Sequence, residues 1–194
     1  MRKLHSWLLA AALVLGFAGS ANVASAADDP DEGNVFAHQK LGIPVYDPEA
    51  KRYFMFMKSQ NAVPSQTMWD SVSKQAAAQS YKGVRGRLAI IDTPEVHQFL
   101  WTTFKPNHYQ YVWIGLRYLC RAKQLEWSDG TLWKPGMFQI WDAQWNQDVY
   151  TCSEKGNPND WAPVAYTPSM KSWVVKGNHK GYDYYFMEFP TGHE

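Results

Sequence analysis

The chain has 194 residues, with 19 Lys and Arg against 18 Asp and Glu, and a formal net charge of +1. This length is enough to bury one sizeable core but short for two, so we expect a single domain. The near balance of charge excludes partners held by a strong electrostatic field, such as nucleic acid or an anionic membrane surface. The 10 Trp, 11 Tyr and 9 Phe exceed the needs of an ordinary core, so we expect some rings at a ligand surface.

The first residues have the three-part form of a secretory signal peptide. Arg2 and Lys3 form a basic start, an apolar run covers residues 7–18, and small residues occupy positions 24–26. The run is shorter than the roughly 20 residues of a membrane-spanning helix, so we expect cleavage after Ala26 and export, either to the periplasm or out of the cell. An uncleaved membrane anchor is the alternative. Without residues 1–26 the formal charge falls to about −1, and no later apolar run predicts membrane insertion.

Residues 27–43 predict a flexible start of the mature chain, because the first of them are acidic and include Pro and Gly. A folded domain is expected over residues 44–194. Cys120 and Cys152 are the two cysteines of the chain, and export favours a disulfide between them. Two free thiols are the alternative. A zinc site is disfavoured, because no histidine lies near either cysteine in the sequence.

The sequence predicts two helices. Residues 67–80 begin with a capping box at Thr67 and Asp70 and continue with apolar side chains at helical spacing. Residues 94–104 follow a threonine cap and begin with a proline, which favours the first helical position. His97 belongs to this second helix, and we expect it to be exposed to solvent.

Aromatic and β-branched residues predict strands at residues 52–57, 88–91, 111–116, 125–130, 172–175 and 184–189. The strand at 111–116 is expected to be interrupted at Gly115. Residues 133–168 show neither alternation nor a helical period, although they hold four Pro, two Gly and four Trp. Loops of this length are usually functional or disordered, and the Trp content argues against disorder. The order of elements predicts an α+β domain whose first and last strands can pair.

Four motifs in this order resemble the successive signatures of C-type lectin-like domains. They are Gly86–Ile91, Trp113–Leu116, Trp127–Gly130 and Tyr185–Phe189. The resemblance covers about residues 44–190 and implies a C-type lectin-like fold, in which two helices flank small antiparallel sheets. It further implies that a long loop region carries the binding site. Trp113–Leu116 then belongs to the core, and Trp127–Gly130 serves packing and a turn.

The chain departs from the calcium-dependent, sugar-binding members at both of their ligand motifs. Those members have Glu-Pro-Asn or Gln-Pro-Asp in the long loop and Trp-Asn-Asp in the following strand, which supply the oxygen ligands that calcium requires. Here the corresponding segments are Asn157–Asn159, with a cis bond expected before Pro158, and Trp173–Val175, which has no side-chain oxygen. We therefore expect no cofactor. A different calcium site, with ligands from Asp148, Glu154 and Asp160, is the alternative. The family's usual disulfides are also absent, so a bridge between the two cysteines is particular to this chain.

The residues that the sequence singles out for binding lie in the long loop. Flat rings stack on the C–H faces of sugars or anchor protein interfaces, while amides and carboxylates form directional hydrogen bonds. The candidate ligand-binding residues are Trp141, Trp145, Asn146, Asp148, Asn157, Asn159, Asp160 and Trp161. Trp133 belongs to the same aromatic group. Each ring has an alternative role, which is to fill a small core of the loop itself.

No catalytic motif accompanies these residues. The histidines lack the His-Glu-x-x-His pattern, and no Gly-rich phosphate loop is present. The sequence therefore predicts a monomeric, exported recognition domain that binds a glycan or a protein surface without calcium, and not an enzyme. The alternative is a structural or accessory subunit of an envelope or secreted assembly. Such a subunit buries its loop aromatics in a permanent partner, and when isolated it exposes a large apolar patch and self-associates.

Overall fold

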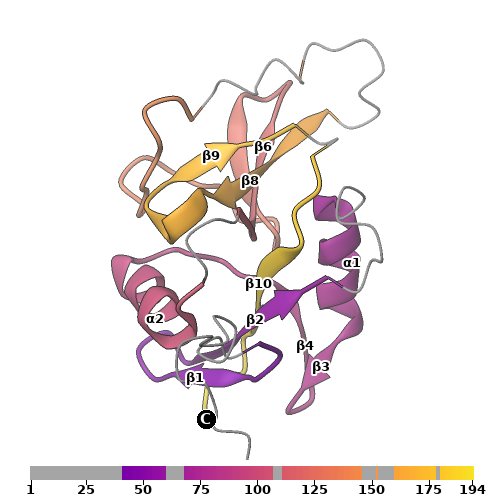
Figure 1. The fold of residues 1–194 in the computed structure, drawn as a ribbon, viewed down its shortest axis with the longest axis vertical. Coiled ribbons are helices and arrows are strands. Elements are labelled where there is room, and N and C mark those ends of the chain that lie inside the picture. The colour runs from indigo at the N-terminus through magenta and orange to yellow at the C-terminus, as the bar shows by residue number, and fades with distance from the viewer. Residues whose placement is uncertain (1–40, 60–67, 107–110, 146–151, 153–159, 178–179) are drawn as a thin grey trace, which may run out of the picture. The chain divides into compact units, whose positions relative to one another are not determined.

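The computed structural model describes residues 41–59, 68–106, 111–145, 152, 160–177 and 180–194 (Figure 1). Its helices are α1 (Trp69–Ala78) and α2 (Pro94–Phe104). Its strands are β1 (Val45–Asp47), β2 (Arg52–Lys58), β3 (Ser80–Tyr81), β4 (Val84–Arg85), β5 (Arg87–Leu88), β6 (Val112–Leu119), β7 (Gln124–Trp127), β8 (Trp161–Tyr166), β9 (Trp173–Val175) and β10 (Tyr184–Phe189). The predicted α+β class is confirmed.

Most of the strands form one sheet in the order β1-β2-β10-β6-β8-β9, with β5 also paired to β10 and β7 to β6. The first and last long strands, β2 and β10, pair antiparallel along their length, as predicted. Among the described strands, β10 and β6 alone run parallel, with Tyr184 opposite Val112 and Tyr185 opposite Trp113. This parallel pair joins into one sheet what the resemblance implied as separate small sheets.

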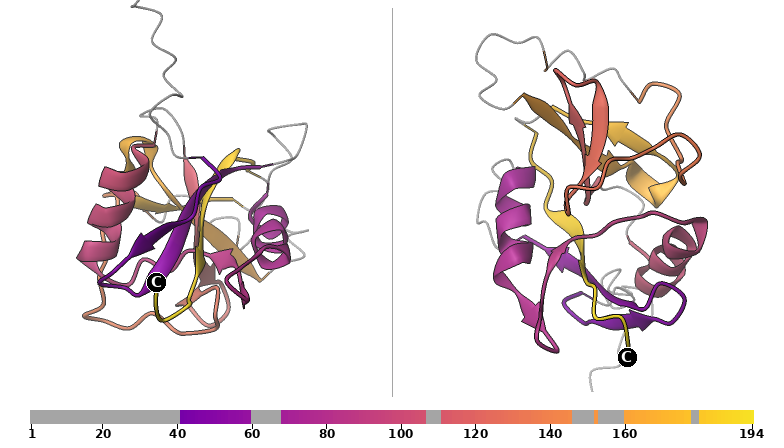
Figure 2. Two further views of the ribbon diagram at one scale, coloured as in Figure 1. Left: turned by 90° about the horizontal axis from the view of Figure 1, so that it is seen from below. Right: turned by 180° about the vertical axis from the view of Figure 1, so that it is seen from behind.

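The two helices cover opposite faces of the sheet. In Figures 1 and 2, α1 and α2 lie on either side of the β2–β10 pair. Val96, Leu100 and Phe104 of α2 pack in one buried cluster, and α1 contributes Trp69 and other apolar residues to a second cluster. Side chains alternate along a strand, so β6 serves both clusters: Ile114 lies in the first and its neighbour Trp113 in the second.

The packed chain begins before the predicted domain start at residue 44. Leu41 forms a parallel bridge with Phe56, and the amide of Gly42 donates to the Phe56 carbonyl at 2.8 Å. Residues 1–40 lie outside the described residues, so the signal peptide and most of the flexible segment stay predictions. Within the described part of the chain, no helix is long and apolar enough to cross a membrane.

The first helix is shorter than predicted, and the capping box is wrong. Met68 occupies the N-cap position and its side chain makes no capping hydrogen bond, while Thr67 lies outside the described residues. The indole Nε1 of the buried Trp69 donates to the Ile114 carbonyl at 2.7 Å, so a tertiary contact fixes the start of α1. The second helix begins and ends as predicted, and the Thr93 hydroxyl accepts from the amide of residue 96 at 3.2 Å.

The long loop predicted from residue 133 to 168 contains a strand that the sequence analysis missed. β8 pairs antiparallel with β6 on one side and with β9 on the other. Pro163 concealed it, because a proline inside a run normally argues against a central strand. The structure tolerates Pro163 because the β6–β8 register shifts between Trp113 and Arg117. The Pro163 carbonyl still accepts a hydrogen bond from the backbone amide of Lys176 at 2.7 Å.

Gly115 does not interrupt β6, which continues to Leu119. The glycine at this position instead lets the backbone of residues 88 and 89 approach β6 closely. The amide of Gly115 donates to the Ala89 carbonyl at 2.8 Å. A Cβ at this position would lie 2.6 Å from the carbonyl oxygen of Leu88 and 2.9 Å from that of Ala89. The predicted strand at 88–91 is shorter in the structure: β5 ends at Leu88, and the next residue, Ala89, donates to the Phe186 carbonyl at 2.9 Å.

We expect Gly115→Ala to destabilise the domain by about 1–3 kcal/mol, because β6 must move away from two backbone oxygens that cannot rotate aside. Urea unfolding of the variant measures the loss. Ser128 Oγ, 2.7 Å from the added Cβ, is the flexible neighbour. The Ser128 hydroxyl also donates to the Leu88 carbonyl at 2.8 Å, so the double variant Gly115→Ala/Ser128→Ala should be at least as unstable as the single one, and a full recovery of stability would contradict this account.

A buried carboxylate on β10 links this strand to β2 and β5 through ion pairs. Glu188 on β10 is fully buried and accepts from Arg87 Nε at 2.7 Å and from Arg52 Nη1 at 3.1 Å. Burial raises the pKa of Glu188, and the two guanidinium groups oppose that shift. Each arginine has a second acid on its outer side: Arg52 pairs with Asp92 at 2.6 Å and Arg87 with Asp129 at 3.3 Å. Two arginines, on β2 and β5, and three carboxylates thus form one ion-pair network centred on Glu188 of β10.

Candidate ligand-binding site

The chain after β7 is tied to two strands by backbone hydrogen bonds. The amide of Trp133 donates to the Leu125 carbonyl on β7 at 2.9 Å. Further along, the amide of Trp173 on β9 donates to the Ile140 carbonyl at 2.7 Å, and the amide of Asp142 donates to the Trp173 carbonyl at 2.9 Å. The first third of the predicted long loop therefore has a defined course against the sheet.

Between this segment and the β6–β7 hairpin lies a pocket of about 680 Å³, which we call the aromatic pocket. Small-molecule sites typically enclose roughly 300–1,000 Å³. The rings that line it are Tyr118, Trp133, Trp141 and Trp145. Its polar lining residues are Lys123, Gln124, Lys134 and Gln139. Leu132, one of the exposed large hydrophobic residues, also lines it.

The rings of the aromatic pocket are supported from beneath. Trp141 and Trp145 have ring centroids 5.0 Å apart, and Tyr118 lies 6.4 Å from Trp145. Trp141 packs edge to face on Trp173, which is fully buried, at 5.4 Å. The amide of Val175 donates to the Trp145 carbonyl at 2.9 Å. All the lining rings are half-buried, so each packs on the core and keeps part of its surface accessible.

The structure brings together only some of the residues that the sequence singled out. Trp141 and Trp145 line the aromatic pocket. Trp161, at the start of β8, packs in the cluster on the opposite face, with its ring 5.2 Å from Trp69 and 5.6 Å from the Arg117 guanidinium carbon. Trp161 is therefore not part of the aromatic pocket, although the sequence places it in the same predicted loop as Trp141 and Trp145. Outside the described residues lie Asn146, Asp148, Glu154, Asn157, Asn159 and the peptide bond before Pro158.

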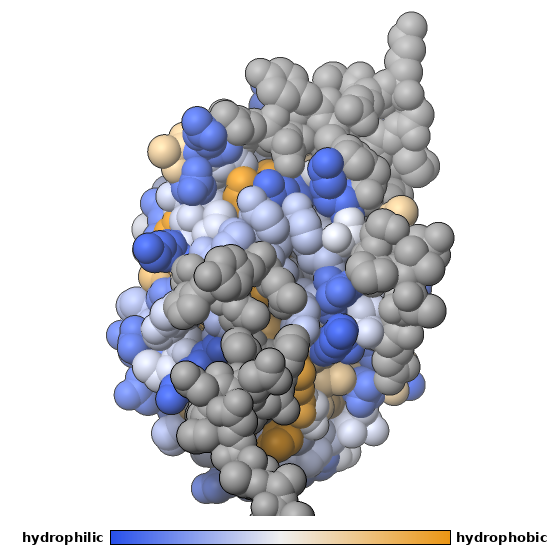
Figure 3. Space-filling model, viewed as in Figure 1, coloured by the Kyte–Doolittle hydropathy of each residue, from blue (hydrophilic) through white to orange (hydrophobic). Residues whose placement is uncertain are grey.

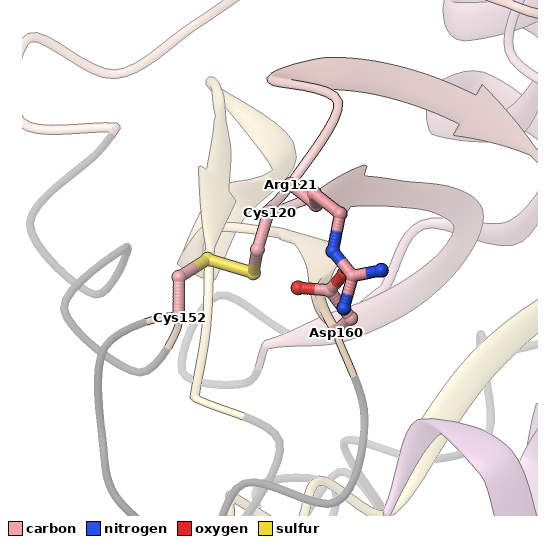
Figure 4. The surroundings of a disulfide bond; sticks show 4 residues. All are labelled: Cys120, Arg121, Cys152 and Asp160. Atoms are coloured by element: carbon pink, nitrogen blue, oxygen red, sulfur yellow. A yellow bond between two sulfur atoms is a disulfide. The ribbon is translucent and has the colours of Figure 1, made fainter.

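Cys120 and Cys152 form a disulfide, as predicted, with a Cα–Cα distance of 5.4 Å (Figure 4). Beside it, Arg121 Nε lies 3.0 Å from Asp160 Oδ2, and the amide of Cys120 donates to the Asp160 carbonyl at 2.9 Å. These contacts join the end of β6 to the start of β8. They also give the Asp160 carboxylate a cationic partner of its own.

Metal-binding groups do not gather in the described part of the chain, where no three His, Cys, Asp or Glu side chains are placed to hold an ion. Trp173, Val174 and Val175 form β9, and all three are buried in the core. Because these residues are a tryptophan and two valines, the strand that would carry half of a calcium site offers no side-chain oxygen.

Several lining residues of the aromatic pocket were not predicted. Tyr118 and Gln124 lie on β6 and β7, and Lys123 has a left-handed conformation, with φ 54°, in the turn between them. Lys134 begins the next turn, which contains Gly136 at φ 94°. The lysines stand at turns that a sequence can indicate, but only tertiary pairing brings the two turns to one pocket.

His97 is half-buried and not exposed as predicted. Its Nδ1 lies 2.9 Å from the Tyr166 hydroxyl, and its ring lies 5.7 Å from that of Phe138 in the long loop. Burial lowers the pKa of His97. The helical period places residue 97 beside the buried face of α2, but the sequence does not reveal that Phe138 covers it.

We expect His97 to make the domain less stable as the pH falls. Its folded pKa lies below the ordinary value of 6.5, so the unfolded chain takes up the proton first. The stability is complete above that ordinary value and is lost as the pH falls through it towards the lower folded pKa. Thermal unfolding at several pH values should show a smaller slope for His97→Gln than for the wild type. His193→Gln, at an exposed position, is the control, and equal slopes in all three proteins would refute the prediction.

Comparisons with known proteins agree with this geometry. A family profile described as "Lectin C-type domain" matches residues 70–175. Similar solved structures include the carbohydrate-recognition domain of cow CD23, which is 18% identical, with 75% of this chain and 91% of that chain covered and a TM-score of 0.50. The carbohydrate-recognition domain of the human scavenger receptor C-type lectin is 15% identical, with 75% and 94% covered and a TM-score of 0.52. Human lithostathine is 15% identical, with 71% and 91% covered and a TM-score of 0.51. At these identities the likeness shows the fold alone. Comparison with curated proteins finds no match.

Proposed function

Because this chain belongs to the C-type lectin domain family, we propose that it is a recognition domain that binds a glycan or a protein surface through the aromatic pocket, without calcium and without catalysis. Domains of this family commonly bind carbohydrate or protein and are generally not enzymes. The observation that carries the proposal is the aromatic pocket itself, where Trp141 and Trp145 are half-buried and adjacent.

The chemistry of the pocket suits a saccharide. Indole rings present flat apolar faces to sugar C–H groups, and the amides of Gln124 and Gln139 can both donate to and accept from hydroxyl groups. Backbone bonds from β7 to Trp133 and from β9 to Trp145 hold the rings before a ligand arrives. This pre-organisation reduces the entropy that binding must otherwise remove.

Two observations support binding without calcium. The β9 residues Trp173, Val174 and Val175 have no side-chain oxygen, and the Asp160 carboxylate pairs with Arg121. Export, to the periplasm or beyond the cell, belongs to the same proposal. It is supported by the signal-like residues 1–26 and by the disulfide, since disulfides persist in oxidising compartments.

An accessory subunit would need a large apolar surface for its permanent partner. Among the described residues, the exposed large hydrophobic side chains are Ile43, Met68 and Leu132, which come from three different parts of the chain. On the face seen in Figure 3, the described surface is mainly hydrophilic, with small and separate hydrophobic patches. This surface favours a recognition domain that is monomeric when isolated.

A glycan-array assay on the purified, oxidised protein, run with calcium and with a chelator, tests the proposal. We expect saturable binding in both conditions. Trp145→Ala should weaken it by about tenfold or more, as for a central aromatic contact, while Trp145→Phe should retain part of it. Trp161→Phe, on the opposite face of the sheet, is the matched control and should bind like the wild type.

Other outcomes would redirect the function. Binding that disappears with the chelator would indicate a calcium site. Absence of glycan binding by a protein that is monomeric in gel filtration would favour a protein ligand. Self-association together with absence of glycan binding would favour the accessory subunit.

A further inference from the structure

The aromatic pocket has an uneven charge. Among the described residues, its lining contains two lysines, Lys123 and Lys134, and no aspartate or glutamate. The chain as a whole carries nearly equal numbers of acidic and basic side chains. The positive charge at this pocket is therefore a local feature and not a consequence of the composition.

The acidic groups near this end of the sheet already have partners. The Asp142 carboxylate accepts from the amide of Gln144 at 2.9 Å and from the Ser172 hydroxyl at 3.2 Å. Glu126 on β7 pairs with Arg117 on β6. The charge of Glu126 is offset by Arg117, and neither Asp142 nor Glu126 lines the pocket beside the two lysines.

The lysines, in contrast, face solvent. Both side chains are exposed, and within the described residues neither ammonium group takes part in an ion pair. Lys123 stands in the turn between β6 and β7, and Lys134 begins the turn after Trp133. Two cations from different turns thus line one pocket together with the rings of Trp141 and Trp145.

We propose that the ligand of the aromatic pocket is an acidic saccharide, one that carries carboxylate or sulfate groups. This inference rests on the proposed function and specifies its ligand class. The sugar rings stack on the indoles, and the anionic groups pair with Lys123 and Lys134. A neutral saccharide leaves both lysines without a partner, and a purely anionic ligand leaves the rings without one.

The test compares ligands that differ only in charge. Binding of the oxidised protein is measured by calorimetry to a uronic-acid hexasaccharide, to the same hexasaccharide after carboxyl reduction, and to a sulfated form of the reduced sugar. We expect the carboxylated or the sulfated sugar, or both, to bind at least about tenfold more tightly than the neutral one, and the difference should shrink at high salt. These arms distinguish the two sources of negative charge.

Variants locate the effect. Lys123→Gln and Lys134→Gln should each weaken acidic-sugar binding about two- to fivefold, as expected for exposed ion pairs, and should weaken neutral-sugar binding less than acidic-sugar binding. The double variant should bind acidic and neutral sugars about equally. Lys74→Gln, an exposed lysine on α1, is the matched control and should behave like the wild type.

The failures are distinguishable. If neutral and acidic sugars bind equally and Trp145→Ala abolishes both, the acidic class is wrong while the recognition function stands. If acidic sugars bind but the lysine double variant is unaffected, the assignment to this pocket is wrong. If polyglutamate binds and no saccharide does, the saccharide class is wrong. If no ligand of any kind binds, the proposed function fails with it.

Discussion

Glu188→Ala will destabilise the domain by about 3–5 kcal/mol, the range expected when one partner of a buried ion pair is removed. The substitution leaves the charges of Arg52 and Arg87 facing a cavity, and the amide of Ile90 loses an acceptor at 3.2 Å. This loss is a large share of the total stability of an ordinary domain, about 5–15 kcal/mol. Chemical denaturation of the variant beside the wild type measures it.

Two further variants separate the buried charge from the outer ion pairs. Glu188→Gln keeps the size of the side chain and one acceptor oxygen, so it should lose stability but less than Glu188→Ala. Asp129→Asn removes the partly exposed partner of Arg87 and should cost less than about 1 kcal/mol. A loss as large for Asp129→Asn as for Glu188→Ala would mean that the network does not centre on the buried carboxylate.

The second large effect is expected at Trp173, the buried ring beneath the aromatic pocket. Its indole contacts the rings of Trp127, Phe138 and Trp141 at centroid distances of 5.9, 5.6 and 5.4 Å. Trp173→Ala should therefore cost about 3–5 kcal/mol, as for other large-to-small changes of buried aromatic residues. It should also abolish ligand binding, because Trp141 loses its support.

Trp113 is the matched control for this prediction, since it is equally buried but lies in the cluster on the opposite face of the sheet. Trp173→Phe and Trp113→Phe should both lower the melting temperature. Measured where both variants are fully folded, glycan affinity should fall for Trp173→Phe and stay at the wild-type level for Trp113→Phe. Equal affinities would show that the pocket does not depend on the ring beneath it.

The sequence correctly predicted those features that short motifs, or the order of motifs along the chain, can indicate. The α2 boundaries followed from its cap and its proline, and the C-type lectin-like fold followed from four motifs in order. Pairing of β2 with β10 followed from the order of elements. The cap and each motif are carried by a few neighbouring residues, while the fold and the β2–β10 pairing follow from the order of motifs and elements along the chain.

The errors arose where tertiary contacts override local patterns. β8 was missed because Pro163 is compatible with a strand only where the register shifts. The α1 start was misplaced because the buried Trp69 indole, and not a capping side chain, fixes it. His97 was predicted to be exposed, because the sequence does not reveal that Phe138, which is distant in sequence, covers it.

The candidate site was predicted in part for the same reason. The density of rings in the long loop identified Trp141 and Trp145, which line the pocket. Trp161 belongs to the same stretch of sequence, but β8 directs it to the other face of the sheet. Tyr118, on a strand far from the loop in sequence, joins the pocket through tertiary pairing alone.

The disulfide between Cys120 and Cys152 also affects how the domain responds to proteases. It closes a covalent ring around residues 121–151, so a single cut of the backbone within that ring produces no separate fragments. The nicked protein would migrate as one species without a reducing agent and as two after reduction. β8, β9 and β10 would stay attached to the rest of the sheet, and the domain could survive such a cut without losing a strand.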